Sequence, residues 1–164
     1  FESGTLSHEG IAGIGAAVDY FSSIGSSMAG EYAGNWPQFS GRRQHVHAAM
    51  DLLLEYEKNL VVRLIDGLLD IDGVSIQGIS DHDAMDRRVP TVGFTHNKIA
   101  PDVIAEEMAR QNIFIWSGHN YAVDVVKTLG IHESGGVARI GPVHYNSIDE
   151  IDEFLLALQP LLLP

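Results

Sequence analysis

An isolated arginine near the end of the chain is the first residue whose setting suggests chemistry. Arg139 stands in the apolar run GGVARIGPVHYN, and it is the only lysine or arginine after Lys127. A guanidinium in such a run must be compensated or reach solvent, and its planar fork matches a carboxylate in a bidentate pair. Two interpretations stay open: Arg139 binds a small carboxylate, or it lies on an exposed strand face or pairs with one of the many acidic residues.

A second candidate lies near the other end, where Gly4 and Thr5 precede a helix that Ser7 can cap. The first backbone N–H groups of a helix have no intrahelical partners, and the helix dipole favours an anion there. The hydroxyl of Thr5 would add one donor toward a phosphate. An ordinary cap and turn shows the same local pattern, so the pattern alone supports either interpretation.

Histidine and acidic residues prompt a third hypothesis, metal-dependent hydrolysis. His45 and His47 form an HxH pair, but positions i and i+2 of a helix point away from each other. The run SDHDAMD at 80–86 holds three aspartates and a histidine, yet it lacks the ordered oxygen ligands and the glycine of an EF-hand. We therefore predict a solvated acidic loop at 80–86 and no metal site.

The elements that must position these residues follow from hydrophobic periodicity. Helical spacing predicts a first helix over 8–24 that stops at Gly25, and a long amphipathic helix that ends near residue 68. The residues between, 25–41, are expected to form an irregular connector. Gly13 and Ala17 lie one turn apart on another face of the first helix, which would let a second backbone approach closely.

The rest of the chain alternates strands and helices. Short β-type runs predict strands over 74–79, 91–95, 113–116 and 137–140. Helices are expected over about ten residues from Pro101, over 119–129 and over 148–158, the last with Ser147 and Glu150 at the spacing of a capping box. A purely helical beginning followed by this alternation predicts a compact sheet covered by helices.

Composition limits the partners. A formal charge of -12 with only ten lysines and arginines repels nucleic acid and anionic lipid surfaces. The 164 residues include no cysteine, and no apolar stretch approaches the roughly 20 residues that a membrane helix needs. We therefore expect one soluble domain, in a reducing, cytoplasmic setting, that binds neither nucleic acid nor membrane.

Taken in order, four segments are similar to the C-terminal part of class V aminotransferases, the fold-type I pyridoxal-phosphate enzymes that include cysteine desulfurases. They are FESGTLSHEGIAGIGAAVDYF, the long helix, IFIWSGHNYA and GGVARIGPVHYNSIDEIDEFLLAL. The resemblance, closest to the cysteine desulfurase-like subgroup, implies an α/β chain whose α+β small domain has a small mixed or antiparallel sheet covered by helices. Residues 1–38 would hold the cofactor-phosphate loop, the interdomain helix and a connector, and 39–164 the C-terminal small domain.

The same resemblance implies roles for particular residues. Gly4 and Thr5 would bind the phosphate of pyridoxal 5'-phosphate across the interface of a homodimer. Arg139 would hold the carboxylate of an amino-acid substrate. Trp116, His119 and Tyr121 would line the substrate site, with Trp116 standing where many relatives have arginine.

Two departures from the family pattern restrict the chemistry. The family's Schiff-base lysine would lie upstream of Gly4, and Lys58, Lys98 and Lys127 match no such motif, so no catalytic residue is predicted here. We expect this segment to be inactive alone and to belong to a longer enzyme. Tyr121 stands where many desulfurases carry the persulfide-forming cysteine, which predicts against that reaction. The alternative is a non-catalytic interaction or small-carboxylate-binding domain.

Overall fold

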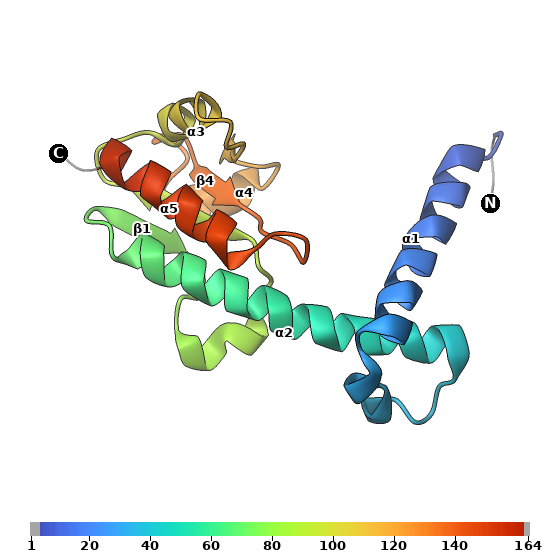
Figure 1. Cartoon of the computed structure of the whole chain (residues 1–164). Coiled ribbons are helices and arrows are strands. Elements are labelled where there is room, and N and C mark those ends of the chain that lie inside the picture. Colours follow the sequence, from blue (N-terminus) through green and yellow to red (C-terminus); the bar gives the residue numbers. More distant parts are fainter. Residues whose placement is uncertain (1–3, 163–164) are drawn as a thin grey trace. The chain divides into compact units, whose positions relative to one another are not determined.

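The computed structural model describes residues 4–162, which divide into two compact units (Figure 1). The first unit runs to Tyr56 and the second begins at Glu57, so the long helix α2 (Gly41–Leu69) contributes to both. The first unit also contains α1 (His8–Ser27) and the 3-10 helix η1 (Gly30–Asn35).

The start of α1 agrees with the sequence, and its end does not. The hydroxyl of Ser7 accepts a hydrogen bond from the backbone N–H of Gly10 at 3.3 Å, as expected of a cap. The helix then continues past Gly25, so the predicted stop is wrong. Gly25 is buried, and a Cβ atom there would overlap the carbonyl of His45 on α2. This glycine therefore allows close helix packing instead of ending the helix.

The segment predicted as an irregular connector is partly regular, because η1 follows α1 almost directly. The side chains of Asn35 and Trp36 both donate to the carboxylate of Asp51, at 3.0 and 2.9 Å. The rings of Trp36 and Phe39 stack on the imidazole of His47, with centroids 4.3 and 4.5 Å away. His47 thus serves packing within this unit.

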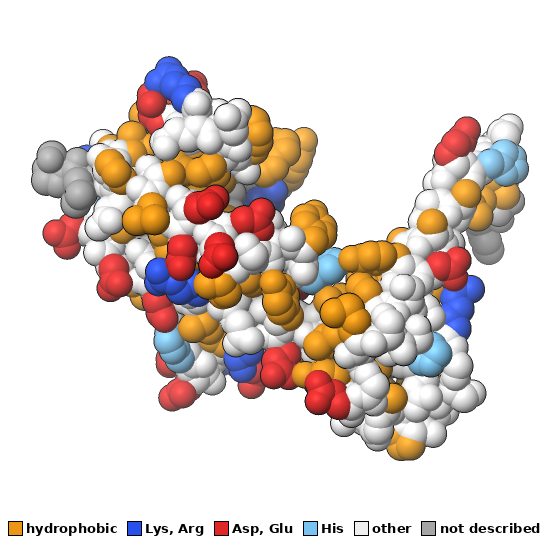
Figure 2. Space-filling view, viewed as in Figure 1, with side chains coloured by type: hydrophobic (Ala, Val, Ile, Leu, Met, Phe, Trp, Pro, Cys, Tyr) orange, Lys and Arg blue, Asp and Glu red, His pale blue; other side chains and the backbone are white. Residues whose placement is uncertain are grey.

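The hydrophobic stripe that predicted α1 remains exposed in the structure. Ile11, Ile14 and Val18 are all exposed, Ile14 by 69%, and hydrophobic side chains are visible along this helix in Figure 2. A Cβ atom at Gly13 would meet no atom within 4 Å, so no described backbone makes the close approach expected there. No helix within residues 4–162 is long and apolar enough to cross a membrane.

The second unit is built on a small antiparallel sheet. Its order is β1 (Val74–Gln77), β2 (Val92–His96), β4 (Val137–Ile140) and β3 (Trp116–Gly118), and every neighbouring pair is antiparallel. Together with the helices that pack on it, this confirms the predicted fold class.

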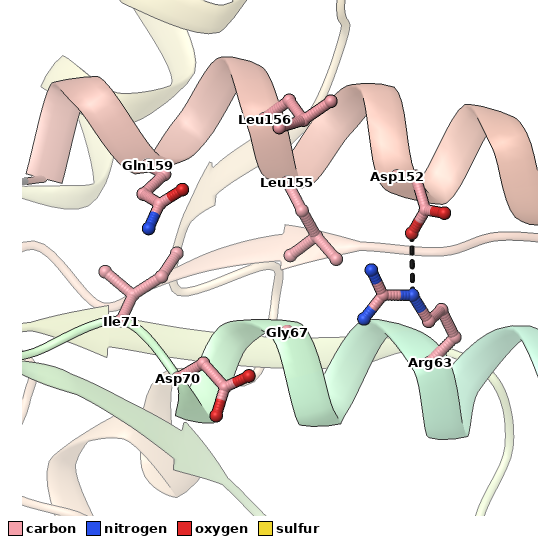
Figure 3. Close-up of a pocket in the computed structure, with 8 residues that line it drawn as sticks. All are labelled: Arg63, Gly67, Asp70, Ile71, Asp152, Leu155, Leu156 and Gln159. Atoms are coloured by element: carbon pink, nitrogen blue, oxygen red, sulfur yellow. Dashed lines mark hydrogen bonds and ion pairs between the residues drawn. The ribbon is translucent and has the colours of Figure 1, made fainter.

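One face of the sheet forms the core. Phe94 of β2 and Ala138 of β4 are fully buried against residues of α2, α3 (Pro101–Ala109) and α5 (Ile148–Leu162). Helix α5 lies beside the C-terminal part of α2 (Figure 1). Figure 3 shows Leu155 directed toward Gly67, where a Cβ atom would collide with it. The absence of a side chain at Gly67 lets the two helices pack closely.

Two loop segments of this unit are more ordered than expected. Residues predicted as a solvated acidic loop form the 3-10 helix η2 (His82–Arg87), capped by the carboxylate of Asp81 and anchored by buried Met85. The predicted capping box is confirmed: Ser147 N–H donates to the Glu150 carboxylate at 2.7 Å, and Glu150 N–H to the Ser147 hydroxyl at 3.2 Å.

Two predicted elements lie elsewhere along the chain. The strand expected over 113–116 begins only at Trp116, because the N–H of Ile113 is still bonded to the carbonyl of Met108 at the end of α3. The helix expected from His119 is α4 (Val123–Thr128), which begins later because Asn120 and Tyr121 have positive φ. Left-handed residues cannot continue a right-handed helix.

Two glycines of α1 test the packing explanation. Gly25→Ala should destabilise the first unit by about 1–3 kcal/mol, because the added methyl meets backbone. Gly13→Ala should stabilise it by about 0.5–1 kcal/mol, since that site is open and alanine favours helix. Urea unfolding in a Trp116→Phe background, followed by Trp36 fluorescence, measures both. Equal effects of the two substitutions would refute the close packing at Gly25.

Candidate functional site

The period-two alternation of β4 decides where Arg139 lies. Ala138 and Ile140 point into the core, so Val137 and Arg139 must occupy the opposite, open face of the sheet. In the register of the sheet, Arg139 lies opposite Trp116 on one side and Gly93 on the other. The guanidinium is therefore carried by a central strand, flanked by an indole and by a position without a side chain.

The guanidinium of Arg139 has neither an acidic nor a carbonyl partner among residues 4–162, unlike those of Arg63 and Arg88. Within residues 4–162 it forms no ion pair, whereas Arg63 contacts Asp152 at 2.6 Å. Arg88 donates to the carbonyls of Ile79 and Thr91, and burial lowers its pKa. The described chain thus gives Arg139 no acidic partner. Its position on the open face of a strand agrees with the interpretation that it lies on such a face. The lack of an acidic partner among residues 4–162 agrees with the interpretation that it binds a small carboxylate.

The side chains around Arg139 enclose a hollow of about 320 Å³. Trp116, His119 and Tyr121, all predicted from sequence, line it together with Arg139. Arg139 is the one permanently charged group in the described lining. Its other members, which the sequence did not indicate, are Ser117, Gly118 and Asn120.

A tight turn presents the aromatic and imidazole groups of this hollow. Gly118, Asn120 and Tyr121 have φ values of 108°, 49° and 64°. The Asn120 amide donates to the carbonyl of Gly118 at 3.0 Å, and the N–H of Tyr121 donates to Nδ1 of His119 at 3.1 Å. A neutral imidazole then carries its proton on Nε2. Positive φ is uncommon for a bulky residue such as Tyr121 and costs about 1–3 kcal/mol, so this turn is held under strain.

Gly136, just before β4, supports the turn from beneath. It is buried with a φ of 81°, and a Cβ atom there would overlap the carbonyl of Gly118. The contact between these two glycines, which both have positive φ, therefore fixes the position of the turn relative to the start of β4.

The two residues predicted to bind the cofactor phosphate belong to the first unit. Gly4 and Thr5 are exposed and lie just ahead of the capped start of α1. The hollow around Arg139 is formed by residues of the second unit alone. The structure thus brings together the four substrate-site candidates, and it provides an exposed hydroxyl beside a helix N-terminus at Thr5.

No lysine of the described chain fits the role of a cofactor-bearing amine at this hollow. Lys58 forms an ion pair with Asp86, and Lys98 and Lys127 are exposed. None of the three lines the hollow. The residues present fit the anionic ends of pyridoxal phosphate and substrate, and they do not fit its covalent attachment.

A second hollow, between α2 and α5, has a different character. It measures about 290 Å³, and Arg63 and Asp152 at its rim already neutralise each other (Figure 3). A free anion gains little from a guanidinium that has its own carboxylate. Arg139 is therefore the better candidate for binding a carboxylate.

Comparison with known proteins identifies the family. Residues 45–154 match the family model for class V aminotransferases. The chain belongs to this family. The resemblance noted in the sequence is thereby confirmed, and enzymes of this family depend on pyridoxal phosphate.

Individual relatives agree with this assignment. Aminotransferase-like protein FGM3 of Gibberella zeae is 31% identical over 113 residues, 68% of this chain and 28% of that protein. A probable cysteine desulfurase of Methanothermobacter thermautotrophicus is 29% identical over 153 residues, 92% of this chain and 31% of that protein. The chain therefore spans about a third of the length of these relatives.

A solved structure shows the same fold. The apo cysteine desulfurase from Thermococcus onnurineus NA1 superposes with a TM-score of 0.61 and 25% identity, over 74% of this chain and 30% of that one. About three quarters of this chain therefore shares its fold with part of that cysteine desulfurase.

Substituting Gly136 tests whether it holds the turn. Gly136→Ala combines left-handed strain with steric overlap, and should lower the free energy of unfolding by about 2–5 kcal/mol. Gly130→Ala is the matched control, because its φ is 72° but its surroundings are open, and it should cost only about 1–2 kcal/mol. Chemical denaturation followed by Trp116 fluorescence, in a Trp36→Phe background, measures both. A smaller loss for Gly136→Ala than for Gly130→Ala would contradict the contact.

Proposed function

We propose that this chain is the C-terminal part of a pyridoxal-phosphate-dependent, class V aminotransferase-like enzyme, and that Arg139 binds the carboxylate of its amino-acid substrate. The guanidinium of Arg139, which has no acidic partner within residues 4–162 and lines a hollow of the second unit, carries this proposal. A bidentate pair with the fork would fix the orientation of the amino acid, and orientation is a large part of what a binding site contributes to catalysis.

The cofactor supplies an electron sink for the bonds at the substrate's α-carbon when it is bound. Thr5 would hold the cofactor phosphate by its hydroxyl, and the start of α1 would hold it by backbone N–H groups. The cofactor would be bound mainly by the partner subunit of a homodimer, so these contacts would cross the dimer interface. The exposed position of Thr5 ahead of the capped helix supports this role.

The Schiff-base lysine would come from a preceding part of a longer chain. This is supported by the finding that the chain spans only about a third of the length of these relatives. The 164 residues alone would then bind the ends of the substrate and cofactor without turning substrate over.

Sulfur transfer through a persulfide is disfavoured in this segment. The sequence has no cysteine, and the turn that carries Tyr121 offers a phenol, which cannot accept a sulfane sulfur. Transamination, β-elimination and epimerisation all use the same carboxylate anchor, so each is compatible with the proposed role of Arg139.

A second candidate is a non-catalytic domain that binds small carboxylates. It is favoured by one observation, that the second unit completes the hollow without the first. Visible absorbance of bound pyridoxal phosphate in the complete gene product distinguishes the two, since the non-catalytic domain would show none.

Arg139→Gln tests the carboxylate anchor in the complete protein. We expect a loss of kcat/KM for the amino acid on the order of 100-fold, because the carboxylate loses its charged partner. Cofactor absorbance should persist. Arg110→Gln removes an exposed ion pair with Glu107 on α3 and should change kcat/KM less than about twofold. Equal rates for Arg139→Gln and the unmodified protein would exclude the anchor.

A further inference from the structure

We infer that the hollow selects amino acids with a single carboxylate and an uncharged, flat or apolar side chain, and that Trp116 determines this preference. The inference rests on the proposed function, because it takes Arg139 as the anchor of the α-carboxylate. It goes further by naming the chemical class of the substrate side chain and the residue that recognises it.

The charge of the hollow limits which amino acids it can bind. Arg139 is the one permanently charged side chain in the described lining, so one carboxylate uses the whole cationic capacity of the hollow. The chain carries a formal charge of -12, and Figure 2 shows acidic side chains scattered over the visible face. A second carboxylate would find no second permanent cation in the described lining and would meet the negative potential of the chain. Dicarboxylic amino acids are therefore disfavoured.

The hollow also presents exposed aromatic surface. Trp116 lies directly opposite Arg139 in the β3–β4 register and is 68% exposed. Tyr121, in the same lining, is 98% exposed. A flat or apolar side chain placed against the indole would remove apolar area from water and gain ring contacts. The α-carboxylate on Arg139 brings the substrate side chain within reach of this surface.

The position on the other side of Arg139 has no side chain. Gly93 is its register partner on β2. A Cβ atom at Gly93 would make only an ordinary contact with Val137, at 3.5 Å, and the φ angle of this residue is not in the left-handed region. Packing therefore does not require glycine here. Its effect is to keep the strip of sheet beside the guanidinium clear, which gives a carboxylate access to the fork.

Nitrogen-15 NMR of this chain can measure the preference without any catalytic turnover. The probes are L-phenylalanine, L-aspartate and 2-phenylethylamine, which lacks a carboxylate. Trp36→Phe assigns the two indole N–H signals, and Arg139→Gln assigns the Nε–H signal of Arg139. We expect phenylalanine to shift the Trp116 and Arg139 signals with an apparent affinity about tenfold higher than that of aspartate, and the amine to shift neither.

Substitutions at Trp116 separate recognition from folding. Trp116→Ala should weaken phenylalanine binding about three- to tenfold and leave aspartate binding unchanged, while Trp116→Phe should restore most of the preference. Gly93→Leu, which fills the strip beside the guanidinium, should weaken the binding of both phenylalanine and aspartate.

The possible outcomes distinguish the inference from the function on which it rests. Aspartate binding at Arg139 as tightly as phenylalanine would overturn the inference and leave the carboxylate anchor standing. If neither amino acid shifted the Arg139 signal, the proposed function and the inference would fail together. A preference for phenylalanine that survives Trp116→Ala would show that Trp116 does not determine it.

Discussion

The alternation of side chains along β4 is the constraint on which this unit depends. Ala138 and Ile140 join a core that helices α2, α3 and α5 cover from one side. The same pleat places Arg139 on the other side of the sheet, where no acidic side chain of the described residues neutralises it. Burying one face provides stability, and the other face would keep a charge available for the proposed ligand. A register shift of one residue would exchange the two faces, which would disrupt the core and bury the guanidinium.

The turn beyond β3 shows how the fold holds strained backbone in place. Asn120 and Tyr121 adopt left-handed conformations that cost free energy, and local hydrogen bonds to Gly118 and His119 offset part of that cost. Contact between Gly118 and Gly136 joins the turn to the strand that carries Arg139. Aromatic surface and guanidinium are thus fixed relative to each other by backbone packing, which would suit the proposed site because it has to hold one orientation of its ligand.

Sequence periodicity predicted the sheet, the long helix and the cap residues because each depends on local patterns. It failed where tertiary contacts decide. Gly25 looked like a helix stop but allows a close approach by the backbone at His45. The positive φ of Tyr121, which delays α4, has no signal in a residue that normally avoids it. Resemblance predicted Trp116, His119 and Tyr121 beside Arg139, and the four residues line one hollow. The places of Gly93 and Gly136 beside them follow only from the strand register and the backbone contacts.

In the proposed enzyme, the guanidinium of Arg139 is kept free for a substrate carboxylate. A crystal structure of the complete protein with pyridoxal phosphate and a bound amino acid tests it most directly. We predict both carboxylate oxygens within about 3 Å of the guanidinium nitrogens of Arg139. A carboxylate held by other residues, with Arg139 paired to an acidic side chain from another part of the protein, would contradict it.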